Sequence, residues 1–97
     1  MAKTIIWTES AANDLQRIVE YITIDSGHYA IAFYDAAREI ADSLSTFSNR
    51  GRVVPEINNS NIREVFIHRY RLMYQVQENQ IIILAIIHGA MNFKGEI

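Results

Sequence analysis

Three apolar runs near the C-terminus, separated by gaps of two residues, constrain the fold of this 97-residue chain more than any other feature. Residues 62–67, 70–77 and 80–88 are rich in the β-branched and aromatic side chains typical of strands. The dipeptides between them, His68-Arg69 and Glu78-Asn79, have the length of tight hairpin loops, and Asn79 suits the positive φ that such loops require. These runs predict a three-stranded antiparallel meander.

The first half of the chain shows helical periodicity instead. A short β-favouring run at residues 3–7 precedes it. Apolar residues then recur at helical spacing over residues 9–24, after Thr8 as the expected N-cap, and again over residues 28–47. A three-residue break at 25–27 separates the two runs, which predicts an antiparallel helix hairpin.

The segment between the second helix and the meander is rich in turn-forming residues and holds the only proline. Residues 52–56 are expected to form a short edge strand, where Pro55 is tolerated. The resulting order, β-α-α-β-β-β-β, predicts an α+β fold with an N-terminal strand, a helix hairpin and a mainly antiparallel sheet of three to four strands. We expect a single domain over residues 1–97.

Composition excludes several classes of protein. Hydrophobic residues make up 49% of the chain, too many for a disordered protein, and the longest apolar run has seven residues, too few for a membrane span. No signal peptide is recognisable and no cysteine is present, so we expect a cytoplasmic protein without membrane partners or disulfides. The three histidines lack metal-ligand spacing, and no cofactor motif is found.

The two hairpin loops fix an expected register. Paired residue numbers sum to 137 in the first hairpin and to 157 in the second. Because side chains alternate across a sheet, one face is expected to pack on the helices. This face carries Val65, Ile67, Tyr70, Leu72, Tyr74, Val76, Ile81, Ile83, Ala85 and Ile87. The opposite face carries Glu64, Phe66, Arg71, Met73, Gln75, Ile82, Leu84, Ile86 and His88.

The opposite face needs a cover of its own, because hiding each large aliphatic side chain is worth roughly 1.5–3 kcal/mol. Either the C-terminal tail folds back over it or a partner protein binds there. The candidate binding residues are Phe66, Arg71, Met73, Ile82, Leu84, Ile86, His88, Met91 and Phe93. Arg71 has two open interpretations, a cross-strand ion pair with its diagonal neighbour Glu64 or a functional cation.

Segments in the expected order resemble the RelE/ParE toxin superfamily. They are WTESAANDLQRIVEYI at residues 7–22, GRVVPE at residues 51–56, and IREVFIHRYRLMYQVQENQIIILAIIHGAMNF at residues 62–93. The resemblance implies two helices packed on a mainly antiparallel sheet. It also implies a type II toxin, with an antitoxin encoded beside it as its partner and with roles in growth arrest and plasmid stabilization.

Two functional branches of this superfamily differ in their targets. RelE-like members cut mRNA on the ribosome, whereas ParE-like members inhibit DNA gyrase and are not known as hydrolases. In a ribonuclease, the resemblance would assign catalysis to Arg71, in the Y-R-x-x-Y segment, with His88 as a base and Arg63 as a further cation.

The expected RelE-like constellation is incomplete, which favours the ParE-like branch. Residues 53–70 contain no lysine, Met91 stands where an arginine often follows H-G-x, and no tyrosine follows Tyr74. A ribosome-dependent endonuclease and an inactive toxin kept as an antitoxin-binding partner are the alternatives.

Overall fold

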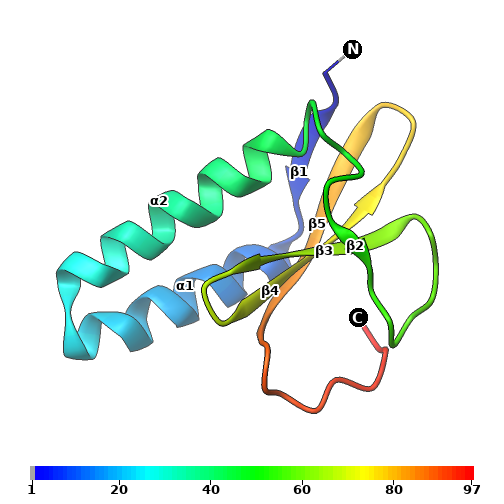
Figure 1. Ribbon diagram of the computed structural model, residues 1–97. Coiled ribbons are helices and arrows are strands. Elements are labelled where there is room, and N and C mark those ends of the chain that lie inside the picture. Colours follow the sequence, from blue (N-terminus) through cyan, green and yellow to red (C-terminus); the bar gives the residue numbers. More distant parts are fainter. Residues whose placement is uncertain (1) are drawn as a thin grey trace.

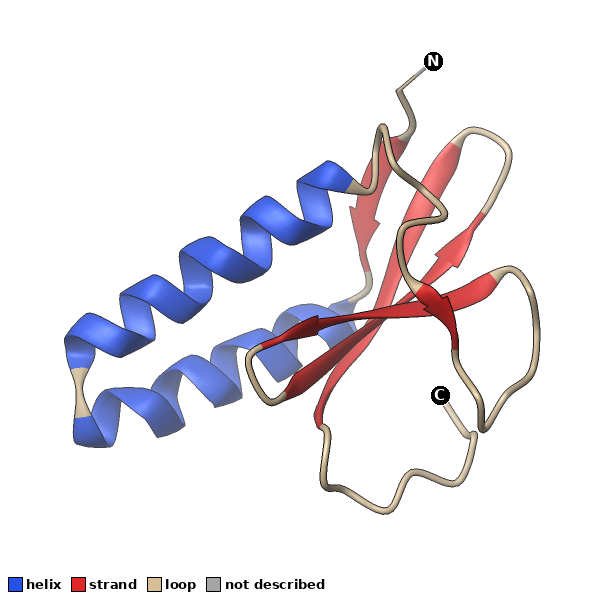
Figure 2. Ribbon diagram, viewed as in Figure 1, coloured by secondary structure: helices blue, strands red, loops and turns tan. Residues whose placement is uncertain are grey.

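In a computed structural model, which describes residues 2–97, two helices lie against one face of a five-stranded mixed sheet (Figures 1 and 2). The elements are β1 (Thr4–Trp7), α1 (Glu9–Asp25), α2 (Gly27–Ser43), β2 (Arg52–Val53), β3 (Ile62–Ile67), β4 (Tyr70–Val76) and β5 (Gln80–His88). The strand order is β1-β5-β4-β3-β2, and β1 pairs parallel with β5 while the other neighbours are antiparallel. The predicted α+β class is confirmed.

The helix hairpin turns on a single residue rather than on the predicted three. Ser26 ends α1 by donating its N–H to Ile22, and its hydroxyl begins α2 by accepting from Tyr29 at 3.2 Å. One side chain therefore caps both helices. At the other end of α1, Thr8 is the N-cap as predicted, with its hydroxyl accepting from Ala11 at 3.0 Å.

The first hairpin follows the predicted register over its whole length, from Ile62 opposite Gln75 to Ile67 opposite Tyr70. Within residues 2–97, the non-glycine residues with positive φ are Asn58 and His68, so the expectation for Asn79 is wrong. The loop after β4 instead closes through the Gln77 N–H, which donates to Gln80. The edge strand β2 is also shorter than predicted, because the chain turns after Val53.

A β-bulge interrupts the second hairpin, and part of the predicted face assignment is wrong as a result. Tyr74 opposite Ile83 fits the predicted register, but Met73 pairs with Ala85, which leaves Leu84 as an extra residue. Beyond Leu84, every side chain of β5 lies on the face opposite to the one predicted for it. Ile86 is 3% exposed in the core beneath the helices, and His88 lies edge-on to Tyr70 at 5.2 Å on that same side. Ala85 and Ile87 take their places on the far face.

The bulge occurs where β5 loses its neighbour, because β1 ends at Trp7. Thr8 donates its N–H and its hydroxyl to the Ile83 carbonyl, and Asp14 of α1 accepts from the buried N–H of Ile86 at 3.0 Å. Thr8 and Asp14 therefore satisfy backbone groups of β5 at and beyond the point where β1 ends.

The C-terminal tail supplies the cover that the far face requires. Residues 89–97 run back past the sheet (Figure 1), and the Phe93 ring lies 5.6 Å from the Arg71 guanidinium. Gly95 and Ile97 border a small hollow that Leu84 and Ile57 also line. The prediction offered the C-terminal tail or a partner protein as the cover of this face, and the structure shows the tail in contact with it. Within residues 2–97 no helix is long and apolar enough to cross a bilayer.

Candidate functional site

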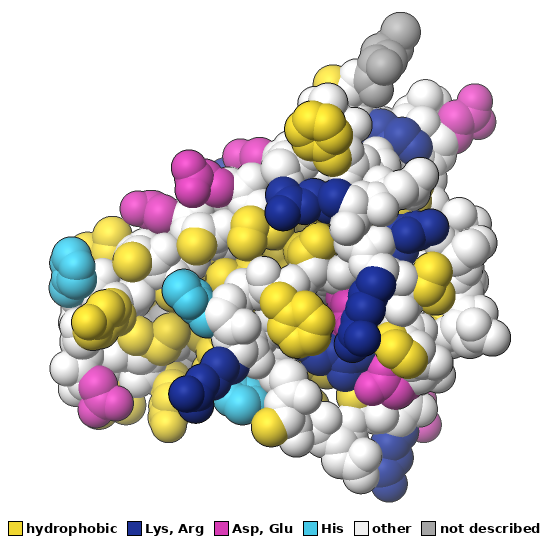
Figure 3. Space-filling model, viewed as in Figure 1, with side chains coloured by type: hydrophobic (Ala, Val, Ile, Leu, Met, Phe, Trp, Pro, Cys, Tyr) yellow, Lys and Arg dark blue, Asp and Glu magenta, His cyan; other side chains and the backbone are white. Residues whose placement is uncertain are grey.

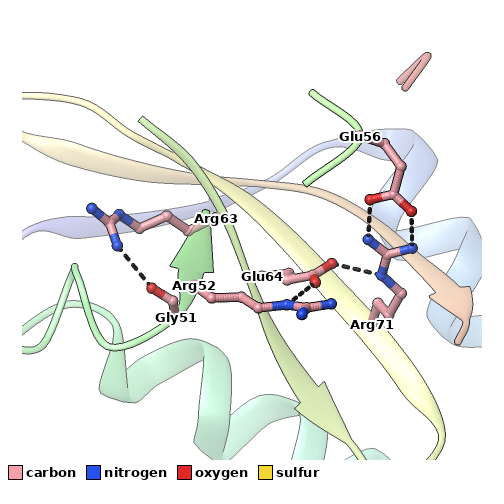
Figure 4. A network of polar contacts seen from close by, with 6 residues as sticks. All are labelled: Gly51, Arg52, Glu56, Arg63, Glu64 and Arg71. Carbon is pink, nitrogen blue, oxygen red and sulfur yellow. Dashed lines mark hydrogen bonds and ion pairs between the residues drawn. The ribbon is translucent and has the colours of Figure 1, made fainter. Parts of the chain in front are cut away.

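Four charged side chains form a continuous network on the far face of the sheet (Figure 4). Arg52 of β2 donates to Glu64 at 2.6 Å, and the other oxygen of Glu64 accepts from Nε of Arg71, also at 2.6 Å. The two terminal nitrogens of Arg71 then bind both oxygens of Glu56, at 2.7 and 2.9 Å. Opposite charges therefore alternate along the order Arg52, Glu64, Arg71, Glu56.

The centre of this network is removed from solvent. Arg71 is 4% exposed and Glu64 is 1% exposed, whereas Glu56 lies at the rim. The hydrogen bonds from Arg71 hold the pKa of Glu56 at about 2, below its ordinary value of 4.5. In return, the hydrogen bonds to Glu56 and then Glu64 raise the pKa of Arg71 against the opposing effect of burial. Arg71 is therefore a permanent cation whose three nitrogens all face carboxylates.

Two phenylalanines close the network from outside. The Phe66 ring lies 5.6 Å from the Arg52 guanidinium, and the Phe93 ring lies 5.6 Å from that of Arg71. Such cation–π contacts strengthen as water is excluded. Of the two sequence interpretations of Arg71, the structure shows the ion pair with Glu64, and it adds Glu56, which the sequence did not reveal.

The three candidate catalytic residues do not come together. Arg71 lies on the far face, while Arg63 pairs with Tyr74 and His88 with Tyr70, two residues that pack toward the helices. Arg63 donates to the carbonyls of Gly51 at 2.9 Å and Ser60 at 3.1 Å. The prediction that His88 shares a face with Arg71 is wrong, because the bulge reverses its direction.

The candidate binding residues are dispersed as well. Met73 is fully buried, and Ile86 belongs to the core. Half-buried residues of the set are Ile82, Leu84 and Phe93, and the exposed ones are Phe66, His88 and Met91. That these residues bind a partner stays a prediction.

Two acidic residues with structural roles were not recognised in the sequence. Asp14 accepts from β5, and Glu56 clamps Arg71. Both lie inside segments that carry the superfamily resemblance, Asp14 in AANDL and Glu56 in GRVVPE. The resemblance therefore included these two residues but did not indicate their structural roles. No group of three histidine, aspartate or glutamate side chains in residues 2–97 is arranged to hold a metal ion.

Comparison with known proteins agrees with this architecture. Residues 5–93 match the family model described as the ParE toxin of the type II toxin-antitoxin system parDE. A search of curated proteins finds no significant match.

Two solved structures are similar in fold. One is described as a chromosomal ParDE toxin-antitoxin system from P. aeruginosa, with a TM-score of 0.74 and 22% identity over 90% of this chain and 96% of the other. The second is the toxin-antitoxin complex RelBE2 from Mycobacterium tuberculosis, with a TM-score of 0.65 and 22% identity over 91% and 99%. Since the family model spans nearly the whole chain, this protein belongs to the ParE toxin family of type II toxin-antitoxin systems.

Proposed function

We propose that this chain arrests bacterial growth by binding DNA gyrase, and that an antitoxin encoded beside it neutralises it. The family supports a toxin, and the state of Arg71 supports a toxin that acts by binding rather than by cutting RNA. A ribonuclease of the RelE type would need this arginine to contact the scissile phosphate. Here two carboxylates occupy its donors and Phe93 covers its face.

The neighbourhood of Arg71 is also electrostatically unsuited to a phosphate. A phosphate that approached Arg71 would meet the negative charges of Glu56 and Glu64, both within hydrogen-bond distance of the same guanidinium. His88 and Arg63 cannot compensate, since both lie on the other face of the sheet. This engagement of Arg71 is the observation that carries the proposal.

Two reactions in parallel test it. Purified chain is added to a gyrase supercoiling reaction and to a translating ribosome extract, each with and without a prior incubation with the neighbouring gene's product. We expect loss of supercoiling, intact mRNA, and recovery of supercoiling after the incubation. Cleaved mRNA with normal supercoiling would establish the ribosome-dependent endonuclease instead.

Induced expression in bacteria separates these activities from the third alternative. Growth arrest that the neighbouring gene relieves is expected of an active toxin. Normal growth at a verified level of folded protein would identify an inactive toxin and overturn the proposal.

A further inference from the structure

The loop that connects α2 to β2, residues 44–51, is held firmly against the end of the sheet. It starts beside β1, where the Lys3 N–H donates to the Ser45 carbonyl at 3.0 Å, and it reaches the opposite edge at β2 (Figure 1). The fully buried Tyr74 donates to the Ser48 carbonyl at 2.8 Å and accepts from the Gly51 N–H at 3.0 Å. The backbone that carries the side chains of this loop is therefore fixed on the strands.

Three cations around this loop have no carboxylate partner. Lys3 donates to a backbone carbonyl at 2.6 Å, Arg50 to a serine hydroxyl at 2.8 Å, and Arg63 to two backbone carbonyls at 2.9 and 3.1 Å. Within residues 2–97, none of the three forms an ion pair. Because every acceptor is neutral, each side chain is held in place and its positive charge is not compensated.

The same three cations lie close to one another. Lys3 and Arg50 line one hollow of about 490 Å³, and the residues that line it include no aspartate or glutamate. The other polar residues of its lining are Thr46, Ser48 and Asn49. Burial raises the pKa of Tyr74, and the bond from Gly51 and the charges of Arg63 and Arg50 oppose this rise, so both arginines lie near its hydroxyl. We call Lys3, Arg50 and Arg63 the cationic edge.

The charges of the chain are separated between its two halves. Residues 8–47 carry seven carboxylates and two cations, whereas residues 48–71 carry five cations and two carboxylates. Those two carboxylates, Glu56 and Glu64, already bind Arg71. Figure 3 shows acidic side chains along α2 and basic side chains over the part of the molecule that carries β2. A polyanion would therefore be repelled by the helices and attracted to the cationic edge.

From this arrangement we infer that the cationic edge binds the phosphate backbone of duplex DNA. Lysine, arginine, hydroxyl and amide groups are the usual donors to DNA phosphates, and they read no base sequence. The choice of DNA rests on the proposed function, because gyrase acts on DNA. A single strand would need several aromatic platforms for its bases, and Phe47 is the one aromatic residue that lines the hollow.

The number of cations sets the expected salt dependence. Each phosphate contact contributes about −0.9 to the slope of log K against log salt, so three contacts give about −2.7. Binding should then weaken by about 40-fold between about 50 and 200 mM salt. Sequence-independent binding of this kind has a Kd of about 10⁻⁴–10⁻⁶ M at physiological salt.

Fluorescence anisotropy of a short labelled duplex, titrated with the purified chain alone, measures this slope. Arg50→Gln and Arg63→Gln each remove one cation of the edge, so the slope should fall to about −1.8 and the same salt change should cost only about 12-fold. Arg17→Gln and Arg38→Gln make the same change on the helices and should keep the slope of the unaltered chain. Circular dichroism confirms that all four variants fold.

Several results would overturn the inference. They are a slope shallower than about −1 for the unaltered chain, edge variants that keep its slope, and helix controls that lose as much as the edge variants. Tighter binding to a single-stranded RNA of equal length would identify RNA as the ligand instead. Binding to polyglutamate without binding to DNA would identify an acidic protein surface.

The DNA titration contains no gyrase, so its outcome is separate from that of the supercoiling assay. Gyrase inhibition by a chain that does not bind the duplex would refute this inference and leave the proposed target intact. Duplex binding that the edge variants weaken, with no gyrase inhibition, would support the cationic edge and refute the target.

Discussion

Replacement of Arg71 by methionine removes the central cation of the charged network while it keeps much of the side-chain volume. The Glu64 carboxylate, which is 1% exposed, then keeps only Arg52 as a partner. Loss of one member of a buried ion pair costs about 3–5 kcal/mol, because the remaining charge stays buried without full compensation. A domain of this size has a total stability of about 5–15 kcal/mol. The variant is therefore expected to be near the limit of folding.

Equilibrium unfolding in urea measures this cost. With a slope of about 1–1.5 kcal/mol per molar, the midpoint is expected to fall by about 2–5 M. The matched control is Arg52→Met, which removes a cation that is 59% exposed and bound to the same carboxylate. In this control the buried Glu64 keeps Arg71 as a partner and only an exposed cation is removed, so the control midpoint should fall by less than that of Arg71→Met.

A double variant separates buried charge from lost packing. Arg71→Met with Glu64→Met replaces the buried pair by apolar side chains, which is often neutral or stabilising, while Arg52 and Glu56 can return to water. Its stability is expected within about 2 kcal/mol of the unaltered chain. A single Arg71 variant that costs less than about 1 kcal/mol, or a double variant as unstable as the single one, would refute the reasoning.

Two further predictions concern neighbouring groups. Tyr74 donates to Ser48 and accepts from the Gly51 N–H, so Tyr74→Phe should cost about 1–3 kcal/mol in urea unfolding, and a smaller loss would contradict these bonds. For Glu56, the folded-state pKa of about 2 lies below 4.5, so its stabilising effect is complete above about pH 5 and is lost as the pH falls from 4.5 to 2. The stability difference from Glu56→Gln should vanish over that range, and a constant difference would exclude the ion pair.

The register of the first hairpin could be predicted from the sequence because apolar and charged residues alternate along its first strand. Val65 and Ile67 alternate with Glu64, so only one register hides the apolar pair and leaves the charge on the other face. The structure has this register throughout β3 and β4. Thr8 and the apolar spacing also predicted the first helix, whereas the second helix ends at Ser43, four residues before its predicted end.

The second hairpin could not be predicted in the same way. Residues 81–87 are all apolar, so either set of alternate side chains could pack on the helices and no phase is specified. The bulge at Leu84 is selected instead by tertiary contacts, in particular Asp14, which lies 72 residues away along the chain from its partner Ile86. The alternation of side chains within a single strand cannot predict a contact between residues so far apart in sequence.

The site shows the same division between near and distant partners. Glu64 is a cross-strand neighbour of Arg71, so its ion pair could be considered from the register alone. Glu56 comes from the turn-rich segment after β2, whose path no periodicity specifies. Without Glu56, the sequence left Arg71 equally suited to structure and to chemistry.

The second carboxylate decides what Arg71 can do. With Glu64 alone, the two terminal nitrogens of the guanidinium would remain available to a phosphate, as a ribonuclease requires. Glu56 occupies both of them in a bidentate pair, and the hydrogen bonds from Arg71 lower the pKa of this carboxylate further below physiological pH. A phosphate would have to displace Glu56 and then bind beside the buried carboxylate of Glu64. The arginine that would bind RNA in a cutting enzyme therefore connects β3, the turn after β2 and the tail here, which is why we propose a toxin that acts by binding.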